Sequence, residues 1–117
     1  VAEMLLGVSR DEQFGPVVLV GLGGVFAEAL EDVALRLAPV EAAEARRALR
    51  ELKGYRILTG FRGRPAGDID ALAEAMVNLS RLAAELEGDV REVDLNPVLV
   101  LPAGRGVVAV DALVALC

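Results

Sequence analysis

The order of strand-like and helix-like segments limits the fold of this chain more than any other feature. Residues 2–8 and 16–20 read as strands on either side of a turn-rich S-R-D-E-Q-F-G stretch. Short extended pieces over residues 25–30 and 33–38 follow a G-L-G-G segment. Two helical segments come next, and strands return at the end. This order predicts an α+β fold in which two main helices pack on one face of an antiparallel sheet.

Two segments show the 3.6-residue period of amphipathic helices. In residues 41–53, Ala and Leu recur at spacings of three and four opposite a face of Glu and Arg, and Gly54 ends the segment. Asp68 is predicted to cap a second helix that runs to residue 86 and ends before Gly88. The connecting stretch, Y-R-I-L-T-G-F-R-G-R-P-A-G, reads as a loop.

The last strands predict a hairpin, followed by a short helical turn from Ala112. With the turn centred in P-A-G-R between residues 103 and 104, Asn96 lies opposite Asp111. Alternation then separates two faces. The apolar face, expected to meet the helices, contains Val93, Leu95, Leu99, Leu101, Val108 and Val110, and the polar face contains Glu92, Asp94, Asn96 and Asp111.

The polar face is a candidate metal site. Carboxylate and amide oxygens suit Mg²⁺ or Mn²⁺, and a small number of protein donors leaves coordination positions for phosphate oxygens. Pro97 fits such a place, because proline cannot donate to a strand ladder and marks an edge or an irregular position. The alternative is that Asp94 and Asp111 are solvated charges on an outer face.

Composition excludes several classes of function. The 117 residues suit one domain, and the net charge of −6 with 3% aromatic residues argues against nucleic-acid binding. No apolar run is long enough for a membrane span. A single cysteine, Cys117, fits a reducing compartment, which predicts a cytoplasmic location. The chain contains no His, so any imidazole chemistry must come from another segment.

Three further features have a functional and a plain interpretation. Gly23 and Gly24 in G-L-G-G could cradle a phosphate or simply form a turn, and a dinucleotide fingerprint would need Gly where Phe26 stands. Arg62 and Arg64 on a Gly-flanked loop could clamp a phosphate or be solvated. Glu3 on an otherwise apolar strand could contact a ribose or a metal, or lie at an exposed edge.

Three segments of the sequence resemble one enzyme family. The segments G-P-V-V-L-V-G-L-G-G-V-F-A-E-A-L-E-D-V-A-L-R-L-A-P, Y-R-I-L-T-G-F-R-G-R-P and E-V-D-L-N-P-V-L-V-L-P resemble the C-terminal part of the ATP-grasp domain of ADP-forming acyl-CoA synthetases (acetate–CoA ligases). The resemblance spans residues 2–112. The β-subunit of succinyl-CoA synthetase is similar too, more distantly.

The resemblance implies a ligase that interconverts acid, CoA and ATP with acyl-CoA, ADP and phosphate through a phosphohistidine. It implies that Asn96 and Asp111 ligate Mg²⁺ with Asp94 beside them, and that Glu3 faces the ATP or ADP. It also implies that the G-L-G-G loop, including Gly23 and Gly24, and the loop of Arg62 and Arg64 line the phosphate side.

The expected partners are the missing N-terminal half of the ATP-grasp domain and a CoA-binding domain or subunit. The start at Val1 without Met also suggests an excised piece, so residues 1–117 are expected to be a single partial domain that is inactive alone and that could self-associate. Two alternatives remain at this point: a non-catalytic regulatory or binding module of a fusion protein such as an acetyltransferase, and a structural fragment without a ligand.

Overall fold

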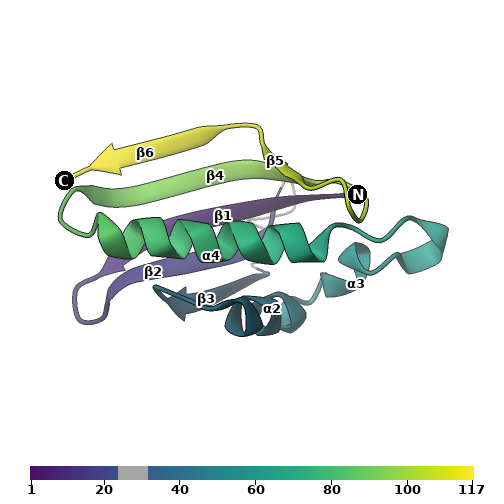
Figure 1. The fold of residues 1–117 in the computed structure, drawn as a ribbon, viewed down its shortest axis with the longest axis horizontal. Helices are drawn as coiled ribbons and strands as arrows, with labels where there is room; N and C mark the ends of the chain where they lie inside the picture. Colours follow the sequence, from purple (N-terminus) through teal and green to yellow (C-terminus); the bar gives the residue numbers. More distant parts are fainter. Residues whose placement is uncertain (24–31) are drawn as a thin grey trace.

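A single antiparallel sheet organises the part of the chain that the structure describes. The computed structural model describes residues 1–23 and 32–117. The strands lie in the order β3-β2-β1-β4, and the far edge of β4 pairs with both β5 and β6 (Figure 1). The predicted α+β class with an antiparallel sheet is confirmed. The elements are β1 (Ala2–Asp11), β2 (Gly15–Leu22), β3 (Val33–Leu37), α2 (Ala42–Glu51), α3 (Tyr55–Leu58), the 3₁₀ turn η2 (Phe61–Gly63), α4 (Ile69–Glu85), β4 (Val90–Val100), β5 (Val107–Ala109) and β6 (Ala112–Leu116).

The first hairpin is closed by a short polar turn. The carboxylate of Asp11 accepts the N–H groups of Gln13 and Phe14 at 2.8 and 3.1 Å, and Gly15 has a φ of +83°. β1 and β2 then pair from Asp11 and Gly15 back to Met4 and Leu22. The predicted first hairpin is therefore confirmed, as is the strand after residue 33. The extended piece expected over residues 25–30 lies outside the described residues.

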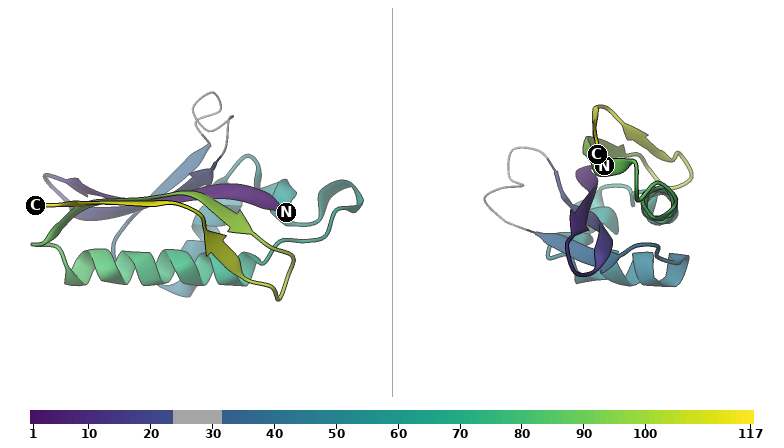
Figure 2. Two further views of the ribbon diagram at one scale, coloured as in Figure 1. Left: turned by 90° about the horizontal axis from the view of Figure 1, so that it is seen from above. Right: turned by 90° about the vertical axis from the view of Figure 1, so that its left-hand side faces the viewer.

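The helices α2 and α4 cover one face of the sheet, and no helix in residues 1–23 and 32–117 covers the other, here called the open face (Figure 2). Asp68 caps α4 as predicted, since its carboxylate accepts the N–H of Ala71 at 3.0 Å. Leu72 and Met76 on α4 are fully buried against the sheet. Ser80 ties α4 to the chain before α2, because its hydroxyl accepts the N–H of Val40 at 2.9 Å. The core is aliphatic, and its largest fully buried members are Met4, Leu6, Leu49, Leu58, Leu72, Met76, Val18, Val20, Val98 and Val100.

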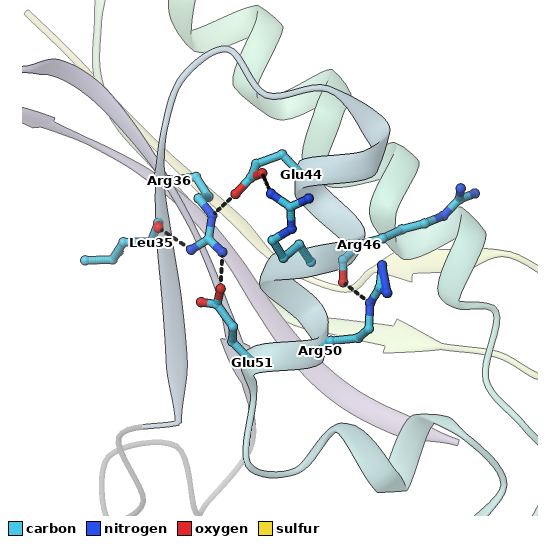
Figure 3. A network of polar contacts seen from close by, with 7 residues as sticks. Leu35, Arg36, Glu44, Arg46, Arg50 and Glu51 are labelled. Atoms are coloured by element: carbon cyan, nitrogen blue, oxygen red, sulfur yellow. Dashed lines mark hydrogen bonds and ion pairs between the residues drawn. The ribbon is translucent and has the colours of Figure 1, made fainter.

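An arginine fastens α2 to the edge strand β3 (Figure 3). Arg36 on β3 donates to Glu44 at 2.6 Å and also to Glu51, one carboxylate from each end of α2. The hydrogen bonds to both carboxylates raise the pKa of the Arg36 guanidinium. Its side chain is only 19% exposed, so these two contacts satisfy a largely covered charge.

One expectation about the last strands is wrong beyond residue 97. Val93 is buried in the core as expected, and Leu95 packs against it. Leu99, Leu101, Val108 and Val110 lie outside the core, which instead takes Val98, Val100 and Val107 (the last partly buried). The cause is a bulge. Met4 pairs with Val98 but Leu6 pairs with Leu95, so two residues of β4 oppose one of β1. An extra residue reverses the alternation, which a strict period of two cannot anticipate.

The C-terminal helical turn expected from Ala112 is also wrong. This segment is β6, which pairs with the first half of β4 from Leu95↔Ala112 to Val90↔Leu116. β5 pairs only with residues 98–100, which leaves the backbone groups of the preceding β4 residues without partners along that edge. Pairing with β6 supplies those partners, and this tertiary demand outweighs the local helix propensity of Ala and Leu.

Across residues 1–23 and 32–117, no helix combines the length and the apolar character needed to cross a membrane.

We predict that Leu72→Ala lowers the free energy of unfolding by about 2–5 kcal/mol, because it removes a fully buried side chain and leaves a cavity. Leu82→Ala is the matched control on the same helix, since Leu82 is 43% exposed, and it should cost less than about 1 kcal/mol. Urea unfolding followed by circular dichroism measures both. Equal losses would contradict the assignment of the buried face of α4.

Candidate functional site

The bulge in β4 gives the candidate site its shape. The predicted register of the last hairpin is observed at two places. Near the turn, Leu99 pairs with Val108, and farther from it the N–H of Asn96 donates to the carbonyl oxygen of Asp111 at 3.2 Å. β4 bends where β5 gives way to β6 (Figure 2). Asn96 on β4 and Asp111, in the link between β5 and β6, are therefore neighbours at this bend.

Asp94 lies two residues before Asn96, on the open face of the sheet. Its neighbours in the register are Gly7 on β1 and Leu113 on β6. Successive residues on one face of a strand are separated by roughly 7 Å, so Asp94 and Asn96 are close enough to serve one ligand. Gly7 has no side chain, so the surface of the sheet beside Asp94 is not raised at this position. A Cβ on Gly7 would lie 3.2 Å from the carbonyl oxygen of Val93. The hollow beside Asp94 measures about 230 Å³.

The donor set of this site is hard and anionic. Asp94, Asn96 and Asp111 supply two carboxylates and one amide, and no arginine pairs with them in the described ranges. One carboxylate oxygen of Asp111 accepts the N–H of Ala112 at 2.9 Å, which leaves the other oxygen free for a ligand. Within the same ranges, no three His, Cys, Asp or Glu side chains gather at metal-binding distances. A cation held here would thus need the Asn96 oxygen together with oxygens from its ligand or from water.

Glu3 and Gly23 lie next to each other at one end of the open face. The N–H of Gly23 donates to the carbonyl oxygen of Glu3 at 2.9 Å, and a Cβ on Gly23 would lie 2.8 Å from the carbonyl oxygen of Met4. Glycine is thus required for this close approach of two backbones. Glu3 pairs with Leu99, whereas Gly7 pairs with Asp94. Glu3 and Gly7 are four residues apart on β1, so Glu3 lies roughly 13 Å from Asp94 along the strand direction and nearer to Asn96. Gly24, the other predicted glycine, lies outside the described residues.

Arg62 and Arg64 do not join the group around Asp94. They line a separate hollow with Ile57 and Phe61 on the loop that follows α3. This loop projects at the end of the molecule where the chain begins (Figure 1).

Asp32 is a structural residue that sequence reasoning missed. It is buried, and its two carboxylate oxygens accept the N–H groups of Lys53 and Gly54 at 2.7 Å each. Its carbonyl oxygen accepts the N–H of Leu22 at 3.1 Å. Asp32 therefore fixes both the chain after Gly21 and the end of α2. No local pattern predicts this role, because the partners of its carboxylate are more than twenty residues away in sequence.

Asp68 also does more than cap α4. Its second carboxylate oxygen accepts the N–H groups of Gly104 and Gly106 at 3.1 and 2.8 Å, which joins the last hairpin turn to the helix. The N–H groups of Ala71, Gly106 and Gly104 lower the pKa of this carboxyl group. Gly104 and Gly106 both have a φ of +85°, so the turn takes its shape from glycines and is held by Asp68.

Comparison with known proteins decides the family. A family model described as an ATP-grasp domain matches residues 1–116. The chain belongs to the ATP-grasp family. Over 114 residues this ATP-grasp chain is 42% identical to subunit β of the ADP-forming acetate–CoA ligase II of Pyrococcus furiosus, covering 97% of the chain and 48% of the subunit. Over 111 residues it is 52% identical to a trans-feruloyl-CoA synthase from an unknown prokaryotic organism, covering 95% of the chain and 16% of that protein.

A solved structure has the same fold. The dinucleotide-forming acetyl-CoA synthetase 1 of Candidatus Korarchaeum cryptofilum, in complex with coenzyme A and Mg-AMPPCP, superposes with a TM-score of 0.93 at 43% identity, over 99% of this ATP-grasp chain and 53% of that one. The chain thus spans about half the length of the subunits that it matches, or about a sixth of the longer ligases. The family and the α+β fold expected from the sequence are confirmed.

We predict that Asp68→Asn lowers the melting temperature at pH 7 and that this difference shrinks in acid. The pKa of Asp68 is lower in the folded chain than the ordinary 3.8, so the ionised carboxylate stabilises the fold above about pH 4. That stabilisation is lost as the pH falls through the folded pKa. Melting curves from pH 7 to pH 2.5 measure the effect, with Asp70→Asn in the first turn of the same helix as control. A difference that stays constant over this range would contradict the assignment.

Proposed function

We propose that residues 1–117 form the C-terminal part of the nucleotide-binding domain of an ADP-forming acyl-CoA synthetase, a single partial domain that carries the magnesium end of the site. The observation that carries the proposal is the pairing of Asn96 with Asp111 across the bend, with Asp94 two residues away on the open face. The named relatives are ligases that form acyl-CoA, and the matching solved structure was determined with coenzyme A and Mg-AMPPCP.

In this proposal, Asp94, Asn96 and Asp111 hold Mg²⁺ on the polyphosphate of ATP or ADP. Two carboxylates and one amide oxygen occupy part of an octahedral shell and leave the rest for phosphate oxygens and water. The carboxylates fix the cation in place, and the cation offsets the negative charge that phosphoryl transfer must accommodate. The chain contains no His, so the phosphohistidine of the reaction acid + CoA + ATP ⇌ acyl-CoA + ADP + phosphate would lie in another segment.

The remaining predicted contacts lie outside this cluster. Glu3 and Gly23 lie together at one end of the open face, where Glu3 would face the nucleotide and Gly23 and Gly24 would approach phosphate. Arg62 and Arg64 would add positive charge on the phosphate side from their own loop.

The open face supports the proposal that other domains complete the site. Besides Asp94 it presents apolar side chains that are about half exposed, namely Val33, Leu35, Leu37 and Val108. The proposed partners are the N-terminal half of the ATP-grasp domain and a CoA-binding domain or subunit in the cytoplasm, and the chain alone would not turn over. Exposed apolar surface of this kind also allows homo-oligomers.

We predict that Mn²⁺, used as a paramagnetic probe for Mg²⁺, broadens the amide resonances of Asp94, Asn96 and Asp111 in this chain before others. Asn96→Ala and Asp111→Asn should each abolish the selective broadening, because each removes one of three ligands. Glu74→Gln is the matched control, because it also removes one carboxylate. Glu74 is exposed on α4, which lies on the opposite side of the sheet from Asp94. Broadening that persists in both ligand variants, or that follows acidic residues everywhere, would contradict the site.

We further predict that in the assembled synthetase Asp111→Asn lowers kcat/KM for ATP by at least about a hundredfold, since transition-state charge loses its counterion. Raising the Mg²⁺ concentration should recover part of the activity. Initial rates of acyl-CoA formation measure both effects. An unchanged dependence on Mg²⁺ would remove Asp111 from the metal site.

A further inference from the structure

β6 forms an edge of the sheet that carries none of the usual protection. One side of the strand pairs with β4, and no strand within residues 1–23 and 32–117 pairs with its outer side (Figure 1). Residues 112–116 include no charged residue, proline or glycine. Leu113, Val114 and Leu116 are each more than half exposed. Soluble proteins usually protect an edge strand with charges, prolines or bulges, because its unpaired backbone groups attract another strand.

The opposite edge strand, β3, is protected in the way that β6 is not. The N–H of Ala38 donates toward β2, to the carbonyl oxygen of Pro16 at 3.0 Å. Backbone groups alternate between the two sides of a strand, so the carbonyl oxygen of Leu35 points away from β2. This oxygen accepts a hydrogen bond of 2.9 Å from the Arg36 guanidinium (Figure 3). A charged side chain thus occupies an acceptor that an incoming strand would need.

Two hydrogen bonds show which backbone groups of β6 face outward. The carbonyl oxygen of Asp111 accepts the N–H of Asn96 at 3.2 Å, and the N–H of Cys117 donates to the carbonyl oxygen of Asp89 at 3.1 Å. The backbone groups of both odd-numbered residues therefore face β4. Because the direction alternates along a strand, the N–H and C=O groups that face outward belong to residues 112, 114 and 116.

We propose that the outer edge of β6 pairs with the same edge of a second copy of this chain, in an antiparallel ladder whose twofold axis passes through Ala115. The outward N–H of Ala112 already donates to the carboxylate of Asp111 at 2.9 Å. The outward groups of Val114 and Leu116 remain for the ladder. Pairing about Ala115 places Val114 opposite Leu116 of the partner subunit, so each of these residues both donates and accepts a hydrogen bond.

The sequence of β6 favours a second copy of itself as the partner strand. In this register Val114 meets Leu116, Leu113 meets Cys117, and Ala115 meets its own small side chain where two strands approach most closely. No charged side chain opposes another along the ladder, so like charges do not repel.

The geometry of this pairing limits the assembly to two copies. The twofold axis of an antiparallel pair is perpendicular to the sheet, so the helices of both copies lie on one side and both open faces on the other. The edge at β3 is blocked by Arg36, so the joined sheet does not grow further. Asp94 and the other candidate ligands stay uncovered, and the dimer does not depend on the Mg²⁺ site.

The test is sedimentation equilibrium of this chain from about 10 µM to 1 mM, with amide hydrogen exchange measured at both ends of the range. A short ladder buries little surface, so we expect a weak dimer whose mass rises from one chain toward two and no further. The N–H groups of Val114 and Leu116 should exchange freely in the dilute sample and slow as the dimer fills. The N–H groups of Leu113 and Ala115 face β4 and should be protected in both samples.

Three variants separate the ladder from other contacts. Leu116→Pro removes an outward N–H without removing a bond to β4, so it should keep the chain monomeric. Leu116→Ala keeps this N–H and should weaken dimerisation by no more than about fivefold. Leu35→Lys places a charge among the exposed apolar side chains of the open face and should leave the dimer intact.

The proposal is overturned by a chain that stays monomeric throughout the range, or by a mass that grows beyond two copies. A dimer that survives Leu116→Pro and is lost in Leu35→Lys would place the contact on the open face. The unaltered chain gives a test that stands even if Leu116→Pro loosens β6. Exchange of the Val114 N–H that is as fast in the concentrated sample as in the dilute one, while the mass doubles, would exclude the ladder.

Discussion

The central position of β4 in the sheet is the constraint on which the site depends. β4 pairs with β1 along one edge and with β5 and β6 along the other, so its backbone groups are satisfied on both sides. The bulge at Asn96 and Pro97 interrupts the pairing of β4 with β1. It keeps hydrophobic residues facing the helices before and after the bend while the backbone between them turns toward the open face. A strand without the bulge could keep either its core contacts or its polar cluster in this register, but not both.

The sequence predicted the fold class, both helices, the first hairpin and the register of the last one, because each depends on local periodicity or on a turn. Asp68 marked the start of α4 correctly. α2 ends at Glu51, three residues before Gly54, and the stretch after Gly54 that was predicted to be a loop begins with the short helix α3. Two features could not be predicted in this way. The bulge depends on the pairing of β4 with β1, some ninety residues away, and β6 forms because β4 offers an unpaired edge. In the C-terminal A-L-V-A-L segment the tertiary demand for pairing prevailed over propensity.

The same division applies to the candidate site. Asn96 and Asp111 could be placed opposite each other from the sequence because a short turn sets the register of a hairpin. Asp94 could be placed beside them because it lies two residues before Asn96 on the same strand. The structural roles of Asp32 and of the second oxygen of Asp68 could not be found, since their partners are backbone N–H groups brought together only by the fold. The cation–π contacts of Phe61 with Arg56 and Arg62 were missed because they depend on the folded path of the loop.

The candidate ligands lie in two separate regions, with carboxylates on the open face beside β4 and arginines on the loop after α3. A magnesium nucleotide needs both kinds of group, one for the cation and one for the phosphates. The most direct measurement is anomalous diffraction at the manganese edge from crystals of this chain grown with Mn²⁺ and a non-hydrolysable ATP analogue. The account predicts a single strong peak about 2.0–2.3 Å from the side-chain oxygens of Asn96 and Asp111. A peak elsewhere, or side chains of Asn96 and Asp111 that point to opposite faces of the sheet, would contradict it.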